Sequence, residues 1–160
     1  MAWYLRPQVT GATVFFTVCL ADRGSDLLVR EVDLLRRAVA ATKRERPFEI
    51  EAWVVLPDHL HSIWQLPAGD RDFATRWRVI KGRFSRELPF GARRASHVAR
   101  AERGIWQRRF WERHLRGEAD FQAHLRYCWQ SPVRLGLCAS PEAWPYSSAR
   151  RDRRCAGADR

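Results

Sequence analysis

The sequence predicts an α+β fold built on an antiparallel sheet. Three runs rich in β-branched and aromatic residues, 12–20, 48–56 and 59–66, are bounded by turn residues and have the composition of strands. Two other segments, 26–45 and 72–88, carry apolar residues at helical spacing. Only Pro57-Asp58 separates the second strand from the third, so we expect these two strands to pair antiparallel through a tight turn.

The first half of the chain predicts a strand, a helix and a hairpin. Residues 12–20 (ATVFFTVCL) form the first strand. Asp26 suits the N-cap of a helix that runs to about Glu45, and Pro47 closes that helix. The strands 48–56 and 59–66 follow, and residues 67–70 form a loop.

The second half predicts two more helices and one more strand. The helix 72–88 places Trp77, Ile80 and Phe84 on one side, and a polar basic loop covers 89–103. Residues 105–115 form a fourth strand, and a helix from Glu118 to about Gln130 is ended by Pro132. The order β-α-β-β-α-β followed by a helix indicates a ferredoxin-like plan, with helices on one face and a C-terminal helix. We expect one domain over residues 1–150 and a frayed basic tail over 151–160.

The charge of the chain is positive and unevenly distributed. The net charge is +11, and residues 71–116 hold 14 Lys/Arg against 4 Asp/Glu. Such a block favours a polyanion, most simply a nucleic acid, although arginine-rich usage and a solvated basic face are the alternatives. Trp77, Trp106 and Trp111 lie among these cations, where they serve as stacking surfaces for bases or as core residues. The candidate DNA contacts are Arg76, Arg78, Lys81, Arg83, Arg108, Arg109 and Arg113.

Other features of the sequence indicate a cytoplasmic protein. The chain has no apolar run long enough to span a membrane, and its first residues lack the apolar centre of a signal peptide. The four cysteines form no Cys-x-x-Cys pair, so we expect free, reduced thiols.

Two histidines one residue apart indicate a metal site. His59 and His61 lie in the third strand, where residues i and i+2 point to the same face. Two imidazoles held side by side on a rigid sheet are a good beginning for a divalent-metal site. The alternatives are surface histidines or histidines satisfied within the core.

The last helix carries a candidate nucleophile. Tyr127 lies away from the apolar stripe of Phe121, Leu125 and Cys128, and it has Ser131 four residues on and His124 three residues back. If its hydroxyl meets a metal held by the histidines, the parts make a phosphoryl-transfer site. An ordinary amphipathic surface tyrosine is the alternative.

The chain as a whole resembles the REP-associated tyrosine transposases, which belong to the single-tyrosine HUH endonucleases. The similarity extends from about Gly11 to Ser148. Its markers include Val55-Leu56-Pro57-Asp58-His59-Leu60-His61, Arg76-Trp77-Arg78-Val79-Ile80-Lys81, Ile105-Trp106-Gln107-Arg108-Arg109-Phe110-Trp111-Glu112, the stretch 120–127, Pro132-Val133 and Trp144-Pro145-Tyr146-Ser147-Ser148.

The resemblance implies a transposase-like activity on single-stranded DNA, localised to the cytoplasm and associated with the nucleoid. It implies that His59 and His61 bind Mg²⁺ or Mn²⁺, and that Tyr127 forms a 5′-phosphotyrosine link in repetitive extragenic palindromes folded as hairpins. The family usually has Asn as third ligand four residues after the tyrosine, where this chain has Ser131. Ser131, acting directly or through a water, Gln130 and His124 are therefore three candidates for that ligand.

Three functions compete at this point. The first is the metal-dependent DNA endonuclease and strand transferase; the second is a DNA-hairpin-binding or regulatory module that no longer cleaves, which the Ser131 departure favours. The third is an RNA-binding protein that uses the ferredoxin-like sheet. The His-x-His pair argues against this function, because RNA binding by such a sheet has no use for it. The choice between monomer and homodimer is left open.

Overall fold

The chain is described from a computed structural model that covers residues 10–88 and 104–152. Its sheet contains β1 (Thr13–Cys19), β2 (Glu49–Val55), β3 (His59–Gln65) and β4 (Trp111–His114). The strand order is β2-β3-β1-β4, and each neighbouring pair is antiparallel. The ferredoxin-like prediction is confirmed. The predicted loop 89–103 and most of the predicted tail lie outside the described residues.

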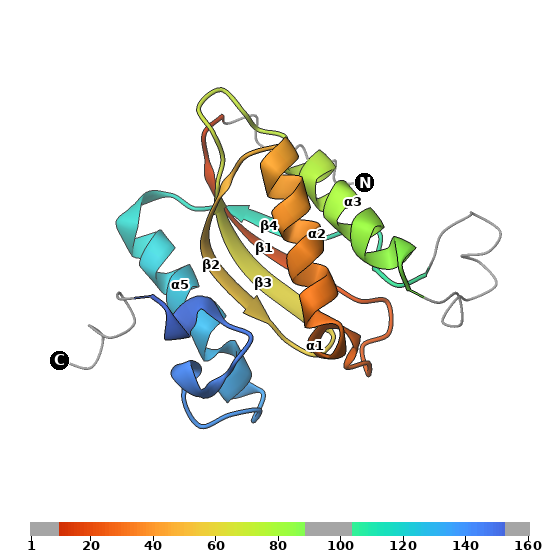
Figure 1. Cartoon of the computed structure of the whole chain (residues 1–160). Helices are drawn as coiled ribbons and strands as arrows, with labels where there is room; N and C mark the ends of the chain where they lie inside the picture. The colour runs from red at the N-terminus through yellow and green to blue at the C-terminus, as the bar shows by residue number, and fades with distance from the viewer. Residues whose placement is uncertain (1–9, 89–103, 153–160) are drawn as a thin grey trace, which may run out of the picture.

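Helices cover both faces of this sheet (Figure 1). α2 (Val32–Glu45) and α3 (Phe73–Arg86) lie side by side over one face, with the short α1 (Leu27–Arg30) before them, and α5 (Gly117–Arg134) covers the other. Short 3-10 turns η2 (Pro141–Ala143) and η3 (Ser148–Arg150) follow α5 and contact it or β2. We call the face under α2 and α3 the helix-pair face and the face under α5 the site face.

Alternation along β1 and β3 gives each face its own core. On the helix-pair face the Trp64 and Trp77 rings stack with centroids 4.4 Å apart, and Phe16 packs against both. On the site face, Phe15 and Ile63 join Leu125, Cys128 and Trp129 of α5. The two sides of the sheet are therefore both buried in part, and the site face holds the smaller core.

The predicted helix 26–45 is interrupted in the structure. The backbone leaves helical geometry at Glu31, between α1 and α2, and the side chain of Asp26 makes no capping hydrogen bond. Instead the N–H of Leu28 donates to the carbonyl of Pro57 over 3.1 Å, and Leu28 is fully buried. This contact fixes α1 to the β2–β3 turn, ahead of the break at Glu31.

The predicted fourth strand, 105–115, was too long. Only Trp111–His114 pair continuously with β1, opposite residues 14–17. Trp106 forms an isolated bridge with Leu20. Between this bridge and the paired residues of β4, Phe110 packs against the core of the helix-pair face. Phe110, which packs against that core, thus lies outside the continuous ladder.

The sequence predicts that Pro132 ends the last helix, and the structure corrects this prediction. Pro132 lies inside α5, and the helix ends where Gly136 adopts a φ of +71°. The N–H of Gly136 donates to Val133 O and the N–H of Leu137 to Pro132 O, which is the Schellman arrangement. A left-handed glycine, rather than the proline, therefore stops the helix.

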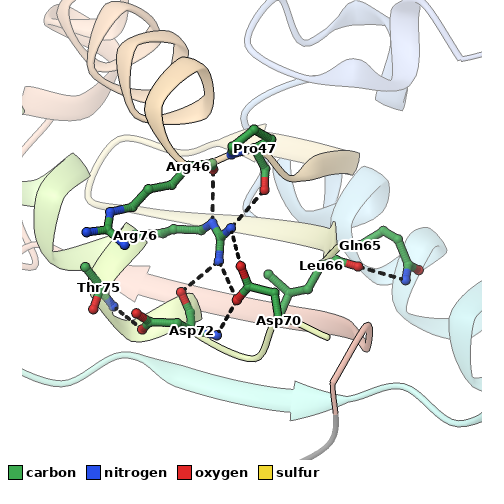
Figure 2. Close-up of polar contacts among 8 residues, drawn as sticks. All are labelled: Arg46, Pro47, Gln65, Leu66, Asp70, Asp72, Thr75 and Arg76. Carbon is green, nitrogen blue, oxygen red and sulfur yellow. Dashed lines mark hydrogen bonds and ion pairs between the residues drawn. The ribbon is translucent and has the colours of Figure 1, made fainter. Parts of the chain in front are cut away.

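Arg76 is part of the interior and not a DNA contact, which corrects the prediction for this residue. It is 3% exposed. Its guanidinium donates to both carboxylate oxygens of Asp70, at 3.0 and 2.8 Å, and to the carbonyls of Arg46, Pro47 and Asp72 (Figure 2). Arg76 thus joins the start of α3 to the end of α2 and to the loop after β3.

Replacing Arg76 by Ala is expected to destabilise the fold by about 2–4 kcal/mol, because three carbonyls and a carboxylate lose their donor. Thermal or urea unfolding measures this. Arg78→Ala removes the same charge from an exposed position of α3 and is the matched control, expected within about 0.5 kcal/mol.

The same contact gives a pH dependence. The Arg76 hydrogen bonds lower the pKa of Asp70 from 3.8 to about 2. A carboxyl group whose pKa is lower in the folded than in the unfolded state stabilises the fold at pH values above its unfolded pKa. This stabilisation is lost as the pH falls from the unfolded pKa through about 2, so the wild type must lose more stability than Arg76→Ala over that pH range. Equal acid sensitivity of the two proteins would contradict this role.

Candidate active site

His59 and His61 lie next to each other on the site face. Both come from β3, and their ring centroids are 5.0 Å apart with the planes at 80°. His61 is 4% exposed, and its Nδ1 lies 2.7 Å from the hydroxyl of Thr17, the residue directly opposite it in β1. Because a threonine hydroxyl can accept as well as donate, this contact is compatible with a protonated Nδ1 and an open Nε2.

Asp58 fixes the tautomer of His59. The Nδ1–H of His59 donates to Asp58 Oδ1 over 2.6 Å, since a carboxylate can only accept, and this leaves Nε2 with its lone pair. Asp58 Oδ2 in turn lies 3.3 Å from Nε of Arg23. Carboxylates of this kind commonly orient metal-binding histidines.

Sequence reasoning treated Asp58 only as a turn residue and missed Thr17 and Arg23. A carboxylate directly before a histidine of metal-site type was a usable signal for Asp58. Thr17 and Arg23 come from distant parts of the chain, and only the register of β1 on β3 brings Thr17 to His61.

The site favours a neutral His61. Burial, followed by the neighbouring His59 and the guanidinium groups of Arg134 and Arg23, lowers the pKa of His61 to about 3. At neutral pH its imidazole therefore carries no charge, which is the form that binds metal ions.

Tyr127 stands beside this histidine pair. It projects from α5, its side chain is 48% exposed, and its ring centroid lies 5.3 Å from that of His61 and 5.9 Å from that of Phe15. Leu125 and Cys128 are buried on the core side of the same helix, as the sequence predicted. The structure thus brings the accessible tyrosine to the two histidines.

Ser131 faces the helix rather than the histidines. It is 2% exposed, and its hydroxyl donates to the carbonyl of Tyr127 over 2.6 Å. Nη2 of Arg134 donates to that hydroxyl at 2.8 Å and to the same carbonyl at 2.9 Å, and the guanidinium lies 4.1 Å from the centre of the Tyr127 ring. The hydroxyl is already engaged twice, so the geometry does not support Ser131 as the third metal ligand.

The other two candidates for that ligand differ in position. His124 directs Nδ1 to the carbonyl of Asp120, at 2.9 Å, and its ring packs 5.1 Å from Phe15. Gln130 is exposed and lies three residues after Tyr127 on α5. Within residues 10–88 and 104–152, no three His, Cys, Asp or Glu side chains are grouped closely enough to hold a metal ion. Among these residue types the site therefore supplies two histidines, and Gln130 remains the accessible amide.

The predicted DNA-contacting cations do not form one surface. Arg78 is exposed on α3, on the helix-pair side, whereas Arg83 on the same helix bonds Thr42 and Glu45. Lys81 donates to the carbonyl of Gln107 over 2.9 Å, and burial lowers the pKa of its amine to about 8. Arg108 and Arg109 are exposed before β4. Arg113, on β4, is the member of the set that shares the site face.

Of the three predicted stacking tryptophans, one is freely accessible. Trp77 is fully buried, and Trp106 is half-buried against Phe84. Trp111 is 55% exposed on β4. Core packing therefore accounts for Trp77, and Trp111 is the candidate for contact with a ligand.

A His-x-His pair on one of the two central strands of a ferredoxin-like sheet, with a tyrosine on the helix that covers the same face, defines a tyrosine nuclease of the HUH type. The chain is 43% identical over 95% of its length, and 85% of the relative's, to the REP-associated tyrosine transposase of Escherichia coli K12. A putative REP-associated tyrosine transposase of Haemophilus influenzae Rd is 39% identical over 95% of this chain and 88% of its own. The chain belongs to the family of REP-associated tyrosine transposases.

The structural comparisons agree. A solved REP-associated tyrosine transposase bound to a REP hairpin superposes with a TM-score of 0.81, at 43% identity, covering 95% of this chain and 85% of that one. A putative transposase from Deinococcus radiodurans R1 shares the fold at 16% identity with a TM-score of 0.50, over 79% of this chain and 94% of its own. No family model matches the sequence. Among the described residues no helix is long and apolar enough to cross a membrane.

Ser131→Ala is expected to leave Mn²⁺ affinity within about twofold of wild type, because its hydroxyl bonds the helix backbone; the loss of one hydrogen bond costs about 1 kcal/mol of stability. His61→Ala is the comparison variant and must weaken the same Mn²⁺ titration far more. A matching loss in both variants would make Ser131 a ligand after all.

Proposed function

We propose that this protein is a metal-dependent single-stranded DNA endonuclease and strand transferase that acts on REP hairpins through a 5′-phosphotyrosine intermediate. The observation that carries the proposal is the placement of Tyr127. Its accessible ring lies 5.3 Å from that of His61, one half of a histidine pair in which Asp58 leaves the Nε2 of His59 open to a ligand and Thr17 is compatible with an open Nε2 on His61.

The residues present fit a divalent metal with an incomplete set of protein ligands. His59 and His61 are the proposed ligands, with Nδ1 of each held by Asp58 and Thr17. Water and phosphate oxygens would complete the coordination, with the Gln130 amide as the candidate third protein ligand, since Mg²⁺ and Mn²⁺ prefer oxygen and Mg²⁺ retains several waters. The bound ion would polarise the scissile phosphate and neutralise charge on its oxygens.

Tyr127 supplies the chemistry that the chain itself contributes. Its phenolic oxygen forms a bond to phosphorus while the bond from phosphorus to the 3′ oxygen breaks. The phenol proton passes to solvent, and the released strand end takes up a proton to become a 3′-hydroxyl. In strand transfer a 3′-hydroxyl attacks the phosphotyrosine, the bond to Tyr127 breaks, and the phenol is restored.

Arg134 positions this nucleophile. Its guanidinium lies over the Tyr127 ring and bonds the carbonyl of the same residue, so the ring is held from one side. A cation above the ring also favours the anionic oxygen that forms as the tyrosine attacks.

The proposed partner is a DNA hairpin, because the structurally similar relative is bound to a REP hairpin. The excess of positive charge in residues 71–116 supplies phosphate contacts, for which Arg78, Arg108, Arg109 and Arg113 are exposed. Because the proposed substrate is a chromosomal repeat, the proposed place of action is the nucleoid, in the cytoplasm. One chain supplies Tyr127 and both histidines, so the proposed site needs no second copy.

A hairpin-binding module that no longer cleaves is the second candidate. The observation that favours it is Ser131, whose hydroxyl is turned to the helix backbone at the position where the family usually has a ligand. The test of Tyr127 below separates the two candidates.

Tyr127→Phe is expected to abolish covalent adduct formation while hairpin affinity stays within about twofold, because phosphate contacts dominate binding. The measurement is a labelled hairpin with a single-stranded extension, incubated with Mn²⁺ and run on a denaturing gel. Tyr146→Phe, in the half-buried C-terminal segment, is the matched control and must retain the adduct. A wild-type protein that binds the hairpin but forms no adduct would establish the binding module instead.

Asp58→Asn is expected to weaken Mn²⁺ binding about 10- to 100-fold, because the amide no longer orients His59 as a carboxylate does. Calorimetric titration of Mn²⁺ measures it without reference to cleavage. Asp33→Asn, an exposed change on α2, is the control for loss of one negative charge. Identical Mn²⁺ affinities in the three proteins would show that Asp58 does not support a metal ligand.

A further inference from the structure

Trp111 is an exposed aromatic side chain at the start of β4. Its exposed fraction is 55%, whereas Glu112 beside it is 8% exposed on the opposite face of the sheet. The Trp111 ring packs edge-on against Phe15, with centroids 5.7 Å apart. One side of the indole is thus supported by the core of the site face while much of the ring stays accessible.

The strand register puts Trp111 in line with the histidines. Trp111 pairs with Thr17 across β4 and β1, and Thr17 pairs with His61 across β1 and β3. The three residues form one row on the site face, so the Trp111 backbone lies two strand spacings, about 10 Å, from that of His61. Phe15 contacts the rings of Trp111, His61 and Tyr127.

Positive charge lies along the same edge of the sheet. Arg113 is two residues after Trp111 and therefore on the same face; it is half-exposed and its contact with Asp120 is loose, at 3.4 Å. An aromatic ring with a cation at its side is the arrangement by which proteins hold an unpaired base and the phosphate next to it.

We propose that Trp111 is a base-stacking subsite for an unpaired nucleotide next to the scissile phosphate, with Arg113 on the adjoining phosphate. The proposal rests on the proposed function, since it takes the strand to be single-stranded DNA. A base stacked on Trp111 anchors the strand at one end of the row, and the phosphate that follows then reaches His61 and Tyr127 at the other end. Trp111 acts here as a positioning residue for the strand.

The geometry favours a base over a second protein chain. Within the described residues β4 is an edge strand of the sheet, so pairing of two copies through it is the competing use of this surface. However, β4 has only four residues and carries Arg113 beside Trp111, and two such edges would bring the like charges of both copies together.

The test is a fluorescence scan with the full chain and a hairpin whose single-stranded extension carries 2-aminopurine at successive positions. We expect the wild type to quench one position next to the cleavage site by stacking. Trp111→Ala should remove that quenching and weaken binding of the extended hairpin by about 5- to 100-fold, with the bare stem unaffected. Trp111→Phe should retain part of both effects, and Leu135→Ala, equally exposed outside the row, should change neither.

Salt dependence separates the two side chains. Loss of Trp111 should leave the slope of log affinity against log salt unchanged, whereas Arg113→Ala should reduce that slope by about one. The thermal midpoint of Trp111→Ala checks that the exposed change has left the fold intact.

Three results distinguish this proposal from the one it rests on. Quenching and affinity that survive in Trp111→Ala, with wild-type adduct still formed at Tyr127, would overturn the subsite alone. A concentration-dependent dimer that Trp111→Ala dissociates, without loss of quenching, would assign the surface to a second copy. Absence of the Tyr127 adduct in the wild type, with quenching at Trp111 intact, would overturn cleavage and retain the subsite.

Discussion

The site depends on the antiparallel register of β1 on β3. This pairing sets Thr17 opposite His61 and turns His59, His61 and Phe15 to the face that α5 covers. A slip of one residue would move every side chain of a strand to the other face, where Val14 and Phe16 now contribute to the larger core. The same core of stacked aromatic residues that stabilises the helix-pair face therefore fixes the register on which the histidines rely.

The two faces of the sheet divide stability from chemistry. The helix-pair face buries the larger core and uses Arg76 to join both of its helices, so an arginine from the basic block is a structural group there. The site face buries less and leaves Tyr127 and Trp111 accessible. Charge composition alone cannot make this distinction, because a buried arginine with five acceptor contacts and an exposed one look the same in the sequence.

The sequence predicted the order of the elements, the hairpin of β2 and β3, and the shared face of the two histidines, because these depend on short-range alternation. It could not predict the end of α5, since Pro132 and Gly136 are both helix-stopping residues and only the left-handed backbone at Gly136 decides between them. Thr17 and Arg23 were missed for another reason. Their roles arise from contacts between segments that are far apart in the chain, and no local pattern marks them.

Ser131 and Arg134 together support the part of α5 that carries Tyr127. The Ser131 hydroxyl finds its acceptor in the carbonyl of Tyr127, one turn back on α5. Arg134 then bonds that hydroxyl and that carbonyl while it covers the Tyr127 ring. The Ser131 side chain is thus part of the support that holds the proposed nucleophile. If the two histidines hold a metal as proposed, the described residues add no third His, Cys, Asp or Glu ligand to them, so solvent and substrate oxygens would complete its coordination.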